Sequence, residues 1–318
     1  MSNPNWGEVA TTTLAHRRKR IADAVSKNNI LLYELRRRKA IKTIGGGRTI
    51  TTPILMGDEN ANFQWYTGRE ALNVAGQEVL TSAEFPWKQW AVGVSISGLE
   101  MLQNSGPEQI HNMMASRIKH AEKTIQNQMH KSAYGDGTGS SGKEFGGLGL
   151  LVNETAGATV GGINSTTYGW WDNMRSITGV AVSTTNIYAN MLNLFLSLRR
   201  GTDMPDLIVS DNTYYSAYNQ SLQSQQRFMD KKLASGGFSN IMFETAPVVA
   251  DGGNGGYADA GMKFLNMDSI ELIMHKKRNN VVLGGPRRPL TEDSDTVIMA
   301  GMGNFVINNR MLNGVLAF

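Results

Sequence analysis

The sequence predicts an α+β protein in which one sheet carries an inserted subdomain. Segments with helical spacing of apolar residues alternate with strand-like segments, and the last third of the chain is almost entirely strand-like. In addition, 35 of the 318 residues are glycine, well above the usual share of ~7%, so many turns and bulges are expected.

The first 45 residues are predicted to form a basic helical arm. They carry a net charge of +7, whereas the rest of the chain sums to −3. Between about residues 9 and 42 apolar side chains recur at near-helical spacing, at Leu14, Ile21, Val25, Leu32 and Leu35. The three glycines at 45–47 would end one or two amphipathic helices here.

Two basic clusters lie on the polar faces of these helices. They comprise Arg17, Arg18, Lys19 and Arg20, then Arg36, Arg37, Arg38 and Lys39. A basic helix face is most often a solvated or partner-facing surface. Contact with nucleic acid phosphates is the more specific alternative.

Residues 46–98 form a long extended segment with large apolar side chains on a polar, glycine-broken backbone. These side chains are Ile54, Leu55, Met56, Phe63, Trp65, Tyr66, Phe85, Trp87 and Trp90. Residues 90–97 alternate as in a half-buried strand, and a strand near 48–56 would pair with it to make a long hairpin. Such a two-stranded excursion is marginal alone in water, so its apolar side chains imply a partner surface.

The clearest helix of the sequence opens at Pro107 and ends at Gly135. Its apolar residues form one narrow seam, at Ile110, Met114, Ile118, Ala121, Ile125 and Met129. A long helix with one apolar stripe is expected to lie across a sheet as a spine.

The remaining elements follow from local pattern. A glycine-rich run over 135–152 reads as a flexible hinge loop, and a loop-heavy stretch extends to about residue 185. A helix is expected over 186–200, then a strand, a turn and a second helix over 206–222. Strands are expected at 246–251, 263–275, 280–285, 296–301 and 304–318.

The sequence predicts no catalytic, cofactor or metal site. It has no cysteine, and the three histidines of the 107–135 helix fall on different faces, which indicates surface or interface roles. A near-match to a phosphate-binding loop ends in Lys143-Glu144, where the motif needs Ser or Thr after the lysine. No apolar run approaches the ~20 residues needed to cross a bilayer, so the default compartment is the cytoplasm.

The order of these parts resembles that of the major capsid proteins of tailed bacteriophages. The resemblance rests on the basic arm, the hairpin with an apolar tip, the long helix, the turn ending in GGLGLL, the segment DLIVSDNTYYSAY and the strands around FLNMDSIELIMH. It implies the Hong Kong 97-type capsid fold, with an N-arm at 1–45 and an E-loop at 46–98. The spine helix and peripheral domain would occupy 99–150 and 260–318, and the axial domain 151–259.

The resemblance further implies a shell protein that assembles as pentamers and hexamers into an icosahedral head around double-stranded DNA. Met56, Phe63, Trp65 and Tyr66 of the E-loop would contact a neighbouring subunit, and the two basic clusters would face the DNA. Other expected partners are a separate scaffolding protein, since the E-loop begins near residue 46, together with portal and decoration proteins. The protein would reside in the virion after assembly in the host bacterial cytoplasm, with no membrane partner.

Two alternatives stay open at this point. One keeps the fold but encloses protein cargo, as in an encapsulin-like compartment. The other is a basic nucleic-acid-binding protein that uses the N-terminal helices.

Overall fold

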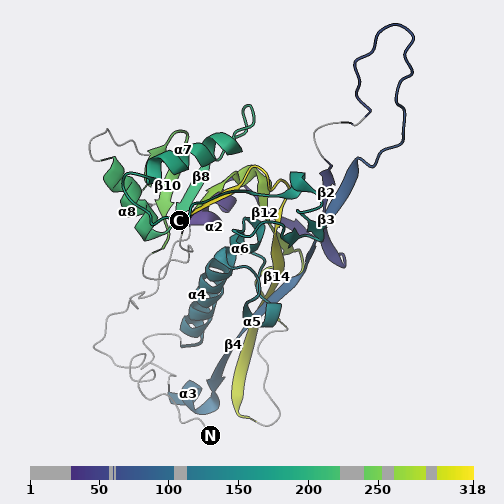
Figure 1. Ribbon diagram of the computed structural model, residues 1–318. Helices are drawn as coiled ribbons and strands as arrows, with labels where there is room; N and C mark the ends of the chain where they lie inside the picture. The colour runs from purple at the N-terminus through teal and green to yellow at the C-terminus, as the bar shows by residue number, and fades with distance from the viewer. Residues whose placement is uncertain are drawn as a thin grey trace.

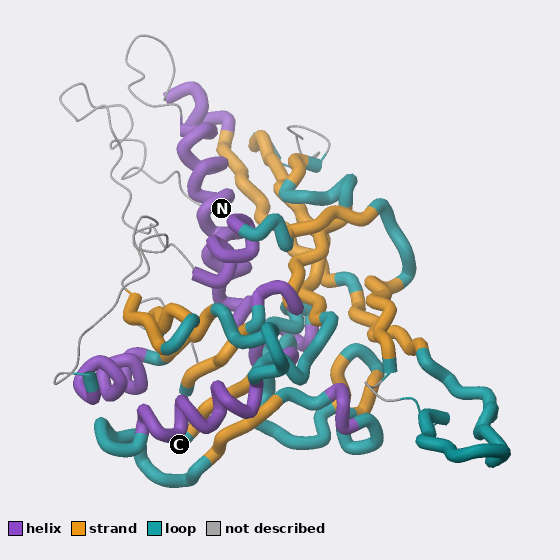
Figure 2. Tube along the Cα trace, turned by 90° about the horizontal axis from the view of Figure 1, so that it is seen from above, coloured by secondary structure: helices purple, strands orange, loops and turns teal. Residues whose placement is uncertain are grey.

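The computed structural model describes residues 30–56, 60, 62–103, 113–222, 240–252, 261–283 and 292–318. It contains a five-stranded sheet with a long helix beside it, a six-stranded sheet, and a two-stranded arm that projects far from both sheets (Figure 1). Seen from above, the arm again extends away from the rest of the chain (Figure 2). The predicted α+β class is therefore confirmed. The helical pattern at 9–29 lies outside the described residues.

The basic arm changes from helix to strand earlier than predicted. Helix α2 (Ile30–Arg37) buries its apolar face, and Lys39 then adopts a left-handed φ of 57°. Strand β1 (Ile41–Ile44) follows and pairs in parallel with β12 (Ile270–His275). The prediction of a helix to residue 42 is wrong, because the β-branched sequence Ile-Lys-Thr-Ile fits a strand beside β12.

The five-stranded sheet is built around the 14-residue strand β14 (Ser294–Ile307). One side of β14 pairs with β4 (Lys88–Ser97), and the other pairs with β12 and the short β13 (Val281–Val282). The predicted alternation of β4 is confirmed by its burial pattern. Its predicted partner is wrong: residues 48–56 pair elsewhere, and β4 belongs to this sheet.

Helix α4 (Met113–Tyr134) lies against β4 along the sheet, as the spine prediction requires (Figure 1). Its seam residues Ala121, Ile125 and Met129 are buried in the main core. Before it, the short helix α3 (Gly98–Gln103) is tied to α4 by an ion pair of 3.1 Å between Arg117 and Glu100. The predicted start at Pro107 lies outside the described residues.

The glycine-rich run after α4 begins with exposed residues at 140–143 and ends in a packed turn from residue 145 onward. It contains α5 (Gly139–Gly142), where Ser140 and Ser141 have left-handed φ and ψ, and α6 (Leu148–Leu151). A Cβ on Gly147 would lie 2.3 Å from the carbonyl oxygen of Ser132. Glycine is required here because the turn packs directly on the last turn of α4.

The six-stranded sheet forms a second layer covered by α7 (Ile187–Leu198) and α8 (Asn212–Ser221). Its strand order is β7 (Met174–Ile177), β15 (Gly314–Ala317), β11 (Met262–Leu265), β8 (Leu207–Ser210), β10 (Ala246–Ala250) and β9 (Asn240–Phe243). Both predicted helices and the strand before α8 are confirmed.

Sheet membership differs from the predicted domain boundaries at two strands. β11 and β15 come from residues 260–318 but pair within the six-stranded sheet. The predicted strand at 263–275 is split into β11 and β12 by a 3-10 turn, η3 (Met267–Ser269). The long β14 contains the predicted strand at 296–301 and the start of the one at 304–318, whose end is β15. β7, β9 and the small hairpin of β5 (Thr159–Val160) and β6 (Ile163–Asn164) were not predicted.

Arg310 is fully buried where the two sheets meet. Its guanidinium donates hydrogen bonds of 2.9 Å each to the carbonyl oxygens of Leu151 and Trp171 and to Oδ1 of Asn173. Burial lowers the pKa of Arg310 to about 10, although the nearby Asp172 carboxylate acts in the opposite direction. The side chain stays charged at neutral pH and joins the glycine turn to η2 (Gly169–Trp171).

We expect Arg310→Ala to lower the free energy of unfolding of the unassembled subunit by about 3 kcal/mol or more, because it leaves buried carbonyl groups unpaired. Urea denaturation followed by tryptophan fluorescence would measure this. The exposed Arg199→Ala is the control and should change stability by no more than about 0.5 kcal/mol. Equal effects of the two variants would contradict the role of Arg310.

Tyr134, the last residue of α4, is linked to the six-stranded sheet. Its hydroxyl donates a 2.5 Å hydrogen bond to Oδ2 of Asp251, which directly follows β10. Burial raises the pKa of Asp251 to about 6, and the bond from Tyr134 opposes that rise only in part.

The raised pKa makes subunit stability depend on pH. The folded chain holds the Asp251 proton more tightly than the unfolded chain, whose carboxyl titrates near 3.8, so this contribution is complete below that pH and lost as pH rises through about 6. We expect Asp251→Asn to reduce the change of the urea unfolding midpoint with pH between 3.8 and about 6. The exposed Asp203→Asn should leave that change as it is in the wild type. An unaltered slope in Asp251→Asn would contradict the assignment.

Candidate assembly interface

The projecting arm is a stalk of two strands that carries an irregular loop. β2 (Thr49–Leu55) pairs antiparallel with β3 (Leu80–Pro86), and the loop spans residues 56–79. One face of the stalk is buried in the main core through Ile50, Ile54, Ala83 and Phe85. The stalk is therefore anchored at its base.

The β5–β6 hairpin braces the stalk from one side. The backbone N–H of Glu84 donates to the Gly161 carbonyl oxygen at 2.9 Å. A Cβ on Gly161, whose φ is +61°, would come within 2.8 Å of the Cβ of Ala83. Only glycine permits this approach, so the direction of the stalk is set by backbone contact.

The aromatic residues at the base of the arm have partners within their own subunit. The Trp90 ring packs edge to face on Phe145 at 5.0 Å, and its Nε1 donates to Oδ1 of Asn280 at 2.9 Å. Trp87 packs on His275 at 5.6 Å. The expectation that these side chains lack internal partners is wrong for the base of the arm.

The loop at the end of the stalk is held together by side-chain amides. Asn62 Nδ2 donates to the Ala75 carbonyl oxygen at 2.6 Å, and Gln64 Nε2 donates to that of Ala71 at 3.0 Å. The backbone N–H of Asn73 in turn donates to Gln64 Oε1 at 3.3 Å. These bridges tie the two sides of the loop where no strand ladder does. Sequence reasoning missed them because they depend on which residues face each other.

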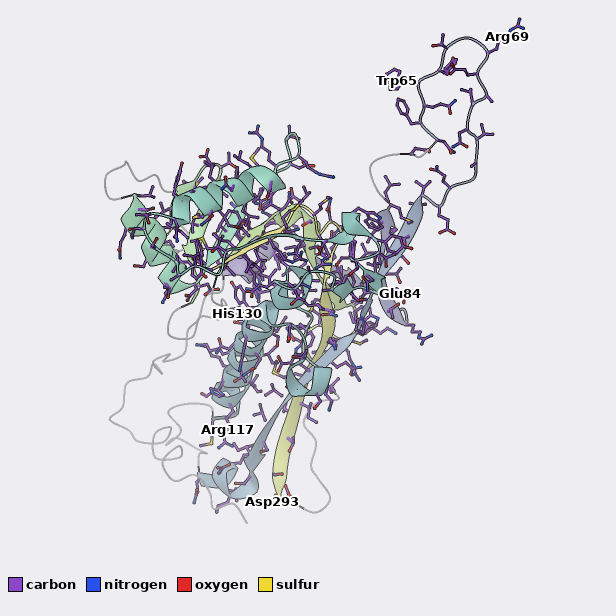
Figure 3. The ribbon with its side chains drawn as sticks, in the orientation of Figure 1. Trp65, Arg69, Glu84, Arg117, His130 and Asp293 are labelled. Atoms are coloured by element: carbon purple, nitrogen blue, oxygen red, sulfur yellow. The ribbon has the colours of Figure 1, made fainter. Side chains whose placement is uncertain are left out.

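Aromatic side chains alternate with these amides and point outward. Phe63 is 70% exposed, Trp65 90% and Tyr66 62%, and the Phe63 and Trp65 rings contact each other at 5.4 Å. Figure 3 shows Trp65 and Arg69 at the far end of the arm, well beyond Glu84 on the stalk. Met56 is half-buried where the loop begins and donates its backbone N–H to the Val79 carbonyl oxygen at 2.8 Å. Three of the four predicted contact residues therefore lie at the tip.

The second basic cluster is partly engaged in ion pairs that hold α2 in place. Arg37 pairs with the buried Glu34 at 2.5 Å, and Arg38 reaches Asp206 at 2.6 Å and Asp268 at 3.1 Å. Burial disfavours the charge of Arg38, but these carboxylates outweigh burial and raise its pKa. Burial raises the pKa of Asp206 in turn, although Arg38 opposes that rise.

Of the predicted basic residues, Arg36 and Lys39 are exposed, and within the described ranges no ion pair involves them. Arg17, Arg18, Lys19 and Arg20 lie outside the described residues. The contact of either cluster with DNA stays a prediction.

Other kinds of site find little support in the described ranges. No three or more acidic or histidine side chains gather there in a way that could hold a metal ion. None of the described helices combines the length and the apolar character that a membrane span needs. His130 is buried in α4, whereas a surface or interface position was expected from sequence.

Solved structures similar to this chain include capsid and encapsulin proteins. The capsid protein of cyanophage A-1(L) is 13% identical, with a TM-score of 0.65 and coverage of 96% of each chain. The capsid protein of a native GTA particle is 11% identical, with a TM-score of 0.60 over 96% of this chain and 95% of that one. The SrpI encapsulin of Synechococcus elongatus is 9% identical, with a TM-score of 0.57 over 96% of both chains. No protein-family model and no curated protein matches the sequence.

The chain has the Hong Kong 97-type capsid fold. Near-complete coverage of both chains decides this, since the likeness includes the arm, the long helix and both sheets. Within this fold, β2, β3 and their loop are the E-loop, and α4 is the spine helix. The fold predicted from the resemblance is confirmed.

Proposed function

We propose that this protein is the major capsid protein of a tailed phage. It assembles as pentamers and hexamers into an icosahedral head shell around double-stranded DNA, in the cytoplasm of a host bacterium, and resides in the virion. The observation that carries the proposal is the E-loop tip, where Phe63, Trp65 and Tyr66 are exposed on an arm anchored at its base. A rigid arm with an apolar end fits a protein whose folding is completed by its neighbours.

The E-loop would act as a clamp between subunits. An aromatic side chain buries 150–250 Å², so three tip residues contribute on the order of 10 kcal/mol of gross burial free energy at ~25 cal/mol per Å². Association itself costs roughly 4–15 kcal/mol, and a preorganised arm keeps that cost at the low end. Repetition of one head-to-tail contact around a ring then closes a capsomer.

The remaining assignments rest on the same proposal. Residues 99–150 and 260–318 form the peripheral domain and 151–259 the axial domain, with β11 and β15 paired into the axial sheet. A separate scaffolding protein, a portal and decoration proteins are the proposed protein partners. The role is structural rather than enzymatic.

An encapsulin-like compartment is the second candidate, because the SrpI encapsulin shares the fold at a TM-score of 0.57. Its particles would contain protein cargo without nucleic acid. Expression of the chain, alone and with a candidate scaffolding protein, followed by negative-stain microscopy and the absorbance ratio of purified particles, tests both candidates. A small oligomer with strongly salt-dependent DNA affinity would overturn both and support the basic nucleic-acid-binding alternative.

Replacement of Phe63, Trp65 and Tyr66 together by serine should leave the subunit folded but prevent stable shells, because the apolar contact with the neighbour is lost. Particle yield after sucrose gradients measures shell assembly, and the subunit melting temperature measures whether the subunit is folded. The matched control keeps apolar surface at the same positions, as Phe63→Leu, Trp65→Phe and Tyr66→Phe, and should still assemble. Serine variants that form shells as heat-resistant as the wild type would refute the clamp.

Replacement of Arg17, Arg18, Lys19 and Arg20 by glutamine should lower the DNA content of particles without preventing assembly, because the phosphate-neutralising charge is removed. The control replaces the three arginines by lysine and keeps the charge. DNA content per particle is measured from absorbance after purification. Equal DNA content in both variants would show that this cluster does not face DNA.

A further inference from the structure

Two basic segments that are far apart in the sequence lie side by side at the edge of the five-stranded sheet. Among the described strands, β1 lies at this edge and pairs in parallel with β12, with Ile44 opposite His275 where both strands end. The backbone N–H of Lys276 extends the pairing by donating to the carbonyl oxygen of Ile44 at 2.9 Å. Because paired parallel strands run in the same direction, the residues that follow β1 and β12 are neighbours.

Both segments carry only positive formal charges. Residues 36–48 contain no acidic residue and six basic ones, which are Arg36, Arg37, Arg38, Lys39, Lys42 and Arg48. Residues 276–280, which follow β12, contain no acidic residue and three basic ones, which are Lys276, Lys277 and Arg278. The second segment joins the first only through the pairing of β1 with β12.

The indole of Trp87 holds the ends of the two segments together. Its Nε1 donates to the Gly47 carbonyl oxygen at 3.0 Å, and its ring packs on the His275 ring at 5.6 Å between centroids. Arg48 directly follows Gly47, and residues 276–277 directly follow His275. We call Arg48, Lys276 and Lys277 the basic corner. Its backbone is held by these contacts, whereas its three side chains are exposed.

Carboxylates neutralise only some of the cations in the two segments. Lys42 pairs with Glu271 at 2.6 Å, and Arg37 and Arg38 are engaged by the carboxylates described above. In the described ranges no ion pair involves any residue of the basic corner. Like charges that are held close together repel one another, so a bound anion would stabilise this corner.

The basic corner extends a band of exposed cations along β1. Arg36 and Lys39 lie before β1 and the corner lies beyond its end, so the four residues of β1 separate the two groups by about 13 Å at ~3.3 Å per residue. Over that length double-stranded DNA presents several phosphates, because it carries one charge per ~1.7 Å of its axis. A band of this length fits a linear polyanion better than a small anion.

The chemistry of the band favours DNA phosphates over an acidic protein. Lysine and arginine side chains contact phosphates without reading the bases, so such binding needs exposed charge but no shaped pocket. A protein partner would need an apolar centre in addition to the charges. β1 offers little apolar surface, because Ile41 is half-buried and Ile44 is 39% exposed.

We propose that Arg48, Lys276 and Lys277 bind the phosphate backbone of the packaged double-stranded DNA. The inference rests on the proposed function and places a DNA contact on the five-stranded sheet, beyond the two basic clusters of the N-arm. The contact is independent of base sequence and weakens with salt, since each neutralised phosphate releases counterions.

The test measures binding of the unassembled full chain to a short fluorescein-labelled DNA duplex by fluorescence anisotropy at several salt concentrations. The corner variant combines Arg48→Gln, Lys276→Gln and Lys277→Gln. A charge-preserving variant combines Arg48→Lys, Lys276→Arg and Lys277→Arg. The matched control removes three exposed cations elsewhere, as Arg69→Gln, Lys143→Gln and Arg199→Gln.

We expect the corner variant to reduce the slope of log affinity against log salt by about 2.7, at ~0.9 per lost phosphate contact. The charge-preserving and control variants should keep the wild-type slope. Equal slopes in the corner and control variants overturn the proposed contact. A corner variant that loses binding to poly-L-glutamate, the probe for an acidic protein partner, but keeps its binding to the duplex also overturns it.

Particle formation separates this inference from the proposed function. Shells of the corner variant that form as the wild type does, with less DNA per particle, support the contact. Such shells with wild-type DNA content overturn it and leave the proposed function in place. If the wild-type chain forms no shell even with a scaffolding protein, the proposed function fails and this inference fails with it, whatever the slope.

Discussion

The position of the E-loop depends on how Trp171 is held in the core. The guanidinium of Arg310 donates to the carbonyl oxygen of Trp171. The indole Nε1 of Trp171 in turn donates to the carbonyl oxygen of Val160 at 2.9 Å. Val160 belongs to the hairpin whose Gly161 turn touches the stalk at Ala83. A buried charge at the junction of the two sheets thus fixes, through one tryptophan, the direction of an arm that leaves the subunit. Because a buried arginine without its acceptors is costly, this arrangement tolerates little change.

The arm itself separates its polar and apolar groups. Amides of Asn62 and Gln64 face inward and join the two sides of the loop, whereas Phe63 and Trp65 face outward. An isolated two-stranded excursion would have too little apolar area to order itself. Core anchoring at the base and side-chain bridges near the tip supply that order, so less conformational entropy is lost when a neighbour binds.

The sequence alone determined the α+β class, the spine helix, the alternation of β4 and the exposed aromatic tip, because each depends on local periodicity. Tertiary structure decided the rest. The pairing of β2 with β3, the helix-to-strand change at Ile41 and the transfer of β11 and β15 to the second sheet are long-range choices that local pattern does not encode. The internal partners of Trp87 and Trp90 also emerge only when segments far apart in sequence are brought together.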